Sequence, residues 1–345
     1  MRYGAIPILL AASVILGAAG VQPAEYSAGE ALLPDFNSFV MMRTDRERLT
    51  VVSIDEAADA LKDYDVVFVG ELHDHIANHL AEMALLRAIH GRAPQLALSM
   101  EQFERDRQST VDDYLAGKIG EETLTSGLGW SNYAEAYRPL VEYAKDHHLP
   151  VIAANAPQNI VRCVAREGVS FLSALPALRR KLVAADLHTE DGPYKQKFWK
   201  FMEDNAAHGG PADASKKAKD ERAEKSFAAQ VTRDDTMAES IANFLRDRPG
   251  YRVMHVTGSF HVEENLGTME RLKIRLPNLK IALVLPLGVK PGEAAEVKLS
   301  DAKGADFAIL LRREPEPYVT DKERKAAETG QTAKFRAVQS NGCKR

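Results

Sequence analysis

Six short apolar runs divide the chain, and each has the length and the β-branched content of a buried strand. They lie near residues 65–70, 95–100, 150–155, 251–259, 280–288 and 306–313. Helical periodicity fills the intervals: apolar residues from Leu80 to Ile89 recur at helical spacing, and Gly91 follows as a stop. Similar patterns cover residues 133–148, 159–166 and 234–245. Strands alternating with helices predict an α/β fold, with a mostly parallel sheet flanked by helices.

The middle of the chain differs, because residues 167–230 contain no strand run and are rich in Lys, Ala and Glu. We expect a small all-helical subdomain inserted into the sheet domain. Tyr194, Phe198, Phe201 and Met202 form a stripe along one helix face. The stripe predicts a local core of this subdomain, and the alternative is that part of it lines a flat apolar ligand. The expected segments are a signal peptide (1–24), a first α/β part (25–165), the helical subdomain (166–230), a second α/β part (231–315) and a polar tail (316–345).

The N-terminus has the order of a secretory signal: Arg2, then the apolar run "AIPILLAASVILGAAG", then small residues. We expect this signal to be cleaved, the alternative being an uncleaved anchor. Export would place the protein in the periplasm or cell envelope, and no lipidation cysteine follows the run. Acidic and basic residues nearly balance, at a net charge of -4, so nothing indicates a nucleic-acid partner. Of the two cysteines, Cys163 reads as a buried small hydrophobe in a helix, and a bridge to Cys343 is the less favoured alternative.

Polar residues of catalytic type follow four of the predicted strands. The strands end in "GELHDH", "MEQFER", "AANAPQN" and "TGSFH", which carry Glu71, His73, Glu101, Asn155 and His261. In an open parallel sheet, functional groups gather beyond the carboxyl ends of the strands. If the four strands are neighbours, these residues converge on one crevice. Imidazole and carboxylate are good ligands for first-row metals, so a divalent metal site is one interpretation. Structural ion pairs are the other.

The other histidines of "VGELHDHIANH" belong to the helix that follows the first strand. His75 and His79 have the spacing of a zinc peptidase helix, but Ile76 stands where that motif needs its glutamate base. Asp74 near the helix start suits a capping role. We expect His75 to be solvated or to support the crevice, and the pattern leaves His79 open. Ser259 is a conceivable but weak nucleophile, and no motif indicates a nucleotide cofactor.

The segments "VGELHDHIANH", "MEQFER", "AANAPQN", "QVTRDDTMAESI" and "VTGSFHVEENLG" follow one another along the chain. Their order resembles that of the ChaN family of haem-binding uptake proteins, which belongs to the superfamily of Tiki proteases and erythromycin esterases. The superfamily's G-E-x-H, later glutamate and G-x-x-H elements fall on Glu71 and His73, on Glu101, and on His261. The resemblance implies noncovalent haem binding, a homodimer and outer-membrane uptake components as partners. It assigns no axial ligand. Around the crevice, Asp74, His79, Arg233 and Asp234 are the expected supporting residues.

Two functions follow from these observations. The first is an exported haem-binding protein in iron or haem uptake, with haem as its cofactor. The alternative is a metal-dependent hydrolase of protease or esterase type, in which Glu71, Glu101 and Asn155 are catalytic and His73 and His261 bind the metal. A scaffold with a vestigial site is the third interpretation.

Overall fold

The computed structural model describes residues 33–45, 48–204, 215–290 and 297–323, together with residues 327 and 343. The predicted signal peptide and most of the predicted polar tail lie outside these ranges. No helix within them is both long enough and apolar enough to cross a bilayer.

One sheet of eight strands forms the centre of the molecule, in the order β2-β1-β8-β7-β3-β6-β4-β5. The strands are β1 (Phe39–Thr44), β2 (Leu49–Val52), β3 (Val66–Glu71), β4 (Leu96–Glu104), β5 (Val151–Asn155), β6 (Arg252–Gly258), β7 (Ile281–Val289) and β8 (Phe307–Arg312). From β8 to β5 every neighbouring pair is parallel. The α/β prediction and all six predicted strands are therefore confirmed.

The sequence pattern did not reveal β1 and β2, which form an antiparallel edge against β8. They are short, with partly exposed side chains on both strands. The parallel strands are different, since β3, for example, is buried at every position. A strand covered on both faces reads as a continuous apolar run, whereas a half-exposed edge strand does not.

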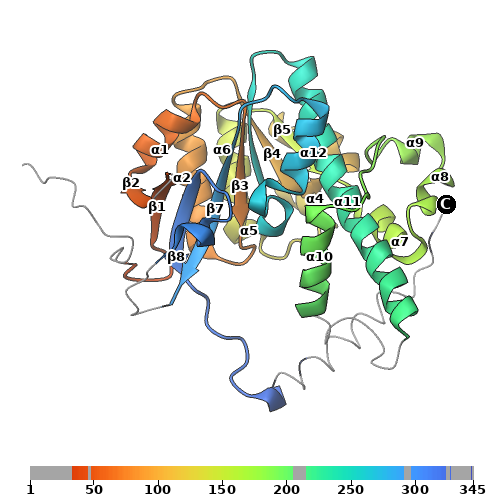
Figure 1. The fold of residues 1–345 in the computed structure, drawn as a ribbon. Helices are drawn as coiled ribbons and strands as arrows, with labels where there is room; N and C mark the ends of the chain where they lie inside the picture. The colour runs from red at the N-terminus through yellow and green to blue at the C-terminus, as the bar shows by residue number, and fades with distance from the viewer. Residues whose placement is uncertain are drawn as a thin grey trace, which may run out of the picture.

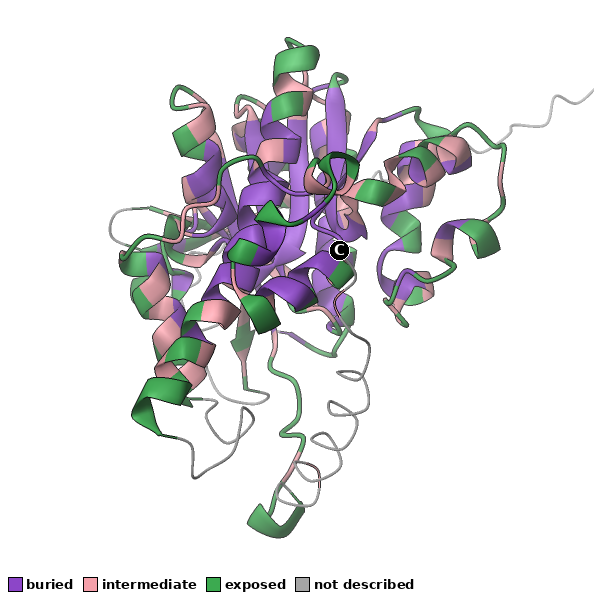
Figure 2. Ribbon diagram, turned by 90° about the vertical axis from the view of Figure 1, so that its right-hand side faces the viewer, coloured by how far each residue is buried: buried purple, intermediate pink, exposed green. Residues whose placement is uncertain are grey.

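Helices cover both faces of the sheet (Figure 1). They are α1 (Ile54–Leu61), α2 (Ile76–His90), α3 (Gln108–Leu115), α4 (Glu121–Thr125), α5 (Tyr133–Ala136), α6 (Arg138–Asp146), α7 (Gln158–Glu167), α8 (Ser170–Ser173), α9 (Ala177–Arg180), α10 (Pro193–Asp204), α11 (Lys216–Asp247) and α12 (Thr268–Arg275). The core of one face includes α1, α2 and α6, and the core of the other includes α11 and α12. Figure 2 shows the central strands as the most continuously buried part.

The helical segment expected in the middle of the chain stands beside the sheet, where α10 packs against α11, and α8 packs against α7, which itself packs on α11 (Figure 1). Tyr194 and Phe198 of the predicted stripe are buried against Phe227 and Val231 of α11, whereas Phe201 is 47% exposed. Met202 is partly buried and packs against the same cluster, so the stripe forms a local core at three of its four positions. The predicted division at residues 230 and 231 falls inside α11, which is continuous from Lys216 to Asp247.

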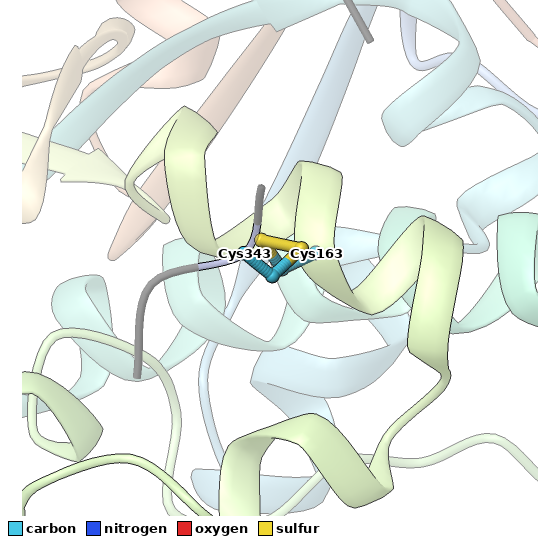
Figure 3. The surroundings of a disulfide bond; sticks show 2 residues. All are labelled: Cys163 and Cys343. Atoms are coloured by element: carbon cyan, nitrogen blue, oxygen red, sulfur yellow. A yellow bond between two sulfur atoms is a disulfide. The ribbon is translucent and has the colours of Figure 1, made fainter. Parts of the chain in front are cut away.

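The two cysteines form a disulfide, which joins α7 to the C-terminal end of the chain (Figure 3). The expectation of an unpaired Cys163 is therefore wrong. Cys163 does lie on the buried face of α7, as its apolar neighbours indicated. Its partner is 180 residues away in a polar segment, and no local pattern links the two positions.

Candidate functional site

The four strands that end in catalytic-type residues are neighbours in the sheet, in the order β3-β6-β4-β5. Glu71 is the last residue of β3, and its side chain is buried. Its Oε1 accepts hydrogen bonds from Gln102 Nε2 at 2.7 Å, Tyr137 Oη at 3.0 Å and His73 Nδ1 at 2.6 Å. Three donors on one oxygen hold the carboxylate in a single orientation. Gln102 and Tyr137 were not predicted: Gln102 stands in the strand-end segment "MEQFER", where only Glu101 was singled out, and Tyr137 lies in a helical pattern.

His73 lies over the end of β6, and its side chain is 40% exposed. A Cβ atom at Gly258 would lie only 2.8 Å from His73 Nε2, so a larger residue at that position would displace the His73 ring. The ring also packs on Trp130, with 4.9 Å between centroids. Burial opposes protonation of His73, but the hydrogen bond to Glu71 and the charges of Glu71 and Glu101 outweigh it and raise its pKa. The two glycine-histidine motifs thus meet here in space.

Glu101 forms the centre of the second half of the site, between β4 and β6. Its Oε2 accepts hydrogen bonds from Thr257 Oγ1 at 2.7 Å and from the Gly258 N–H at 2.8 Å. Its Oε1 lies 3.5 Å from His261 Nε2. Burial raises the pKa of Glu101, but His261, His73 and these hydrogen bonds more than offset it and lower the pKa to about 2. Glu101 is therefore a carboxylate at neutral pH and a poor proton acceptor.

His261 is held from behind by Asp234 of α11. Its Nδ1 lies 2.7 Å from Asp234 Oδ1, which leaves Nε2 facing Glu101. Asp234 also accepts hydrogen bonds from Thr268 Oγ1 at 2.9 Å and Tyr194 Oη at 2.6 Å. Burial lowers the pKa of His261, but Asp234 and Glu101 reverse this and raise it. An imidazole fixed by a carboxylate in this way suits either proton transfer or metal binding.

Asn155 and Arg233 lie beside Glu101, but their polar groups already have partners. Asn155 Nδ2 donates to the Glu101 backbone carbonyl at 3.0 Å, and its Oδ1 accepts from the Ala156 N–H at 2.8 Å. Arg233 donates to Asn155 Oδ1 at 3.4 Å and to the side chain of Gln158. Both residues thus support the β4–β5 end, and a catalytic role for Asn155 stays a prediction.

The start of α2 differs from the sequence-based expectation. His75 is the N-cap residue of α2 and is buried, with Nε2 2.7 Å from the Arg312 carbonyl, so the expectation of a solvated His75 is wrong. Asp74 is exposed and accepts a hydrogen bond from Asn132 at 3.2 Å, and it does not cap the helix. Ser259 Oγ donates to the Glu71 carbonyl at 3.1 Å, which gives no support to a nucleophile there.

His79 points back under the strand-end loop and is buried. Its Nδ1 lies 3.0 Å from Glu82 Oε2, and its Nε2 lies 2.9 Å from the His73 carbonyl oxygen. Burial and the charge of Glu71 raise the pKa of Glu82, while Glu82 and Glu71 raise the pKa of His79 against its burial. The sequence reasoning missed Glu82, although a glutamate on the apolar face of a helix was a detectable signal.

An exposed apolar stripe adjoins His73. Leu72, Ile76 and Leu80 follow at intervals of four residues and are 37%, 47% and 44% exposed. Ile76 and Leu80 lie on one side of α2, because side chains four apart share a helix face, and Leu72 precedes the helix in the loop that carries His73. Exposed apolar side chains grouped in sequence beside polar site residues are typical of a ligand or partner site.

The predicted metal ligands His73, His261, Glu71 and Glu101 do not form a compact group. Within the described ranges, three possible ligand atoms come within 4.8 Å of one another only at Glu71, His79 and Glu82. The crevice residues are nevertheless linked pairwise, through Glu71–His73 and Glu101–His261. A metal-binding role for the predicted set stays a prediction.

Comparison with known proteins gives the family. The family described as "Haem-binding uptake, Tiki superfamily, ChaN" matches residues 57–272. This chain belongs to the ChaN family. The match includes Glu71, His73, Glu101 and His261, so the family segment contains both halves of the site.

Solved and curated relatives of this ChaN-family chain are distant. A structure described as "Cofacial heme binding to ChaN of Campylobacter jejuni" is similar with a TM-score of 0.56 and 15% identity, over 80% of this chain and 97% of that one. It supports the fold. An erythromycin esterase, EreC, aligns with a TM-score of only 0.42 and 13% identity, over 84% of this chain and 87% of that one. The Arabidopsis thaliana protein RETICULATA-RELATED 5, chloroplastic, is 25% identical over 232 residues, which is 64% of this chain but only 31% of that protein.

Proposed function

We propose that this protein is an exported haem-binding protein of an iron or haem uptake system. The observation that carries the proposal is the exposed stripe of Leu72, Ile76 and Leu80 beside the half-exposed His73. Haem is a large flat apolar ligand, and such a surface would bury one of its faces. The family and the ChaN relative that binds haem cofacially support the same ligand class.

His73 is the proposed axial ligand. Haem iron accepts the nitrogen of a neutral histidine. Among His73, His75 and His79, only His73 combines solvent exposure with a ring nitrogen, Nε2, that has no hydrogen-bond partner within the described residues. Glu71 holds the other nitrogen, which is the arrangement that raises the basicity of a ligating imidazole.

Export and self-association complete the proposal. The N-terminal apolar run supports export, and the Cys163–Cys343 disulfide is of a kind that persists in oxidising compartments. An apolar stripe that covers one haem face leaves the other haem face exposed. A second copy with its own haem would cover it, so we expect haem to promote a homodimer. Outer-membrane uptake components are the proposed partners in the cell.

Titration with hemin tests the ligand. The purified protein should give a saturable, shifted Soret band, and sedimentation should show dimers at saturation. Ile76→Glu should weaken binding at least about tenfold, because burying a charge under haem costs more than about 1.4 kcal/mol. Ile274→Glu is the matched control, since Ile274 is 54% exposed on α12. Equal effects of the two substitutions, or a spectrum that stays that of free hemin, would contradict haem binding at this surface.

The axial ligand needs its own test. His73→Asn should alter the Soret position and the spin state of bound haem. His148→Asn is the control, because His148 is exposed and has a positive φ of 57° that asparagine tolerates. If both variants keep the wild-type spectrum, His73 is not the ligand.

A hydrolase is the second candidate, and the Asp234–His261–Glu101 arrangement favours it. Because the pKa of His261 is raised and that of Glu101 is low, His261 would donate the proton and Glu101 would hold the charge of its imidazolium. An esterase and peptidase panel on the wild type and on His261→Asn tests this role. Activity that survives His261→Asn would exclude it.

A further inference from the structure

A possible ion site lies beneath His73, and it shares Glu71 with the support of the proposed axial ligand. Glu71 at the end of β3 and His79 and Glu82 on α2 each direct one ligand atom to a common point. His79 Nδ1 lies 3.0 Å from Glu82 Oε2 and 3.6 Å from Glu71 Oε2. The side chains of Glu71 and Glu82 have no solvent exposure, and that of His79 is 6% exposed.

All three inward-facing atoms are hydrogen-bond acceptors when His79 is neutral. Its Nε2 is beside the His73 carbonyl oxygen, which can only accept, so Nε2 carries the proton and Nδ1 presents a lone pair. Glu71 Oε2 is buried and has no hydrogen-bond partner. Three lone pairs that face one another without a donor require a cation between them, either a proton or a metal ion.

The other atoms of the three side chains are already fixed by donors. Glu71 Oε1 accepts hydrogen bonds from Gln102 and Tyr137, and Glu82 Oε1 accepts one from Asn78 at 2.9 Å. Each group therefore has one atom anchored and one directed inward. Anchored outer atoms of this kind are the usual support of a metal site.

We propose that Glu71, His79 and Glu82 bind one divalent first-row metal ion, with zinc as the best match. Zinc takes imidazole and carboxylate ligands at about 2.0–2.2 Å, which places tetrahedral ligands about 3.4 Å apart. The observed 3.0 and 3.6 Å bracket this value. A 2+ ion also neutralises two buried carboxylates, which a single shared proton does only in part. Three protein ligands leave a fourth position for water.

Metal binding can be measured without hemin, so its outcome is independent of the haem proposal. The full-length protein is freed of metal by chelator and titrated with zinc chloride by calorimetry. Cobalt chloride is added in parallel to give an absorption spectrum that reports the ligand geometry. One zinc per chain is expected. Glu82→Gln should weaken binding more than about 100-fold, since loss of a ligand exceeds the effect of losing a supporting residue.

Two further variants decide where the metal lies. Glu101→Gln removes a buried carboxylate of the strand-end site and tests the competing ligand set, whereas Glu122→Gln on the surface should leave zinc affinity unchanged. No zinc binding, or zinc binding that Glu101→Gln abolishes and Glu82→Gln does not, overturns the proposal. If Glu82→Gln does not fold, anomalous scattering from zinc-soaked wild-type crystals replaces it. A peak between His79 Nδ1 and the two carboxylates supports the site, and a peak elsewhere or none overturns it.

Discussion

Replacing Glu101 with glutamine tests the electrostatics of the strand-end site. The carboxylate accepts hydrogen bonds from Thr257 and Gly258 and faces His261, and its pKa is lowered from 4.5 to about 2. Each pKa unit corresponds to 1.36 kcal/mol, so the ionised group stabilises the fold by about 3 kcal/mol at neutral pH. Glutamine keeps the shape but loses the charge.

The pH dependence separates this electrostatic contribution from simple loss of packing. The folded pKa of Glu101 lies below its unfolded value, so its contribution is complete above pH 4.5 and is lost as the pH falls towards 2. The linkage relation gives about 3 kcal/mol at pH 7 and about 1.4 kcal/mol at pH 3. A poorly accommodated amide adds a cost of about 1–3 kcal/mol that does not change with pH.

Urea unfolding of the wild type and Glu101→Gln at pH 7, 5 and 3 measures these differences. The difference in free energy of unfolding should shrink by about 2 kcal/mol between pH 7 and pH 3. Glu122→Gln on the surface should stay within about 0.5 kcal/mol of the wild type at every pH. A difference for Glu101→Gln that is constant across this range would refute the reasoning, because it would mean that Glu101 has the same pKa in both states.

Three further changes test other parts of the structure. Burial lowers the pKa of His255 to about 3, so the wild type should lose stability as the pH falls from 6.5 to 3. In urea unfolding, the free energy of unfolding of His255→Asn should fall less steeply over this pH range than that of the wild type. Gly258→Ala should lower the free energy of unfolding in urea by about 1–3 kcal/mol and shift the NMR resonances of the His73 ring. Unchanged His73 resonances would contradict the close approach. Cys343→Ser removes the disulfide that closes a loop of 180 residues, so it should lower the thermal midpoint. Chain entropy sets the largest expected loss of stability at about 5 kcal/mol. An unchanged midpoint would argue against a bridge to Cys163.

The six parallel strands, the helices between them and the membership of the family could be predicted from the sequence, whereas β1 and β2 could not. Buried parallel strands appear as continuous apolar runs, and amphipathic helices carry a period of 3.6 residues, so both are encoded locally. The strand-end rule placed Glu71, Glu101 and His261 at one edge of the sheet. The structure agrees, because β3, β6, β4 and β5 are neighbours.

Only the tertiary structure decided which of these side chains meet. His73 lies over Gly258 because β3 and β6 pair in parallel register, with Glu71 opposite Gly258. Glu82 lies beside Glu71 only because α2 packs its apolar face against the sheet and buries this carboxylate. Local periodicity determines the type of each element, but contacts between distant segments depend on strand order and packing, which no local pattern encodes.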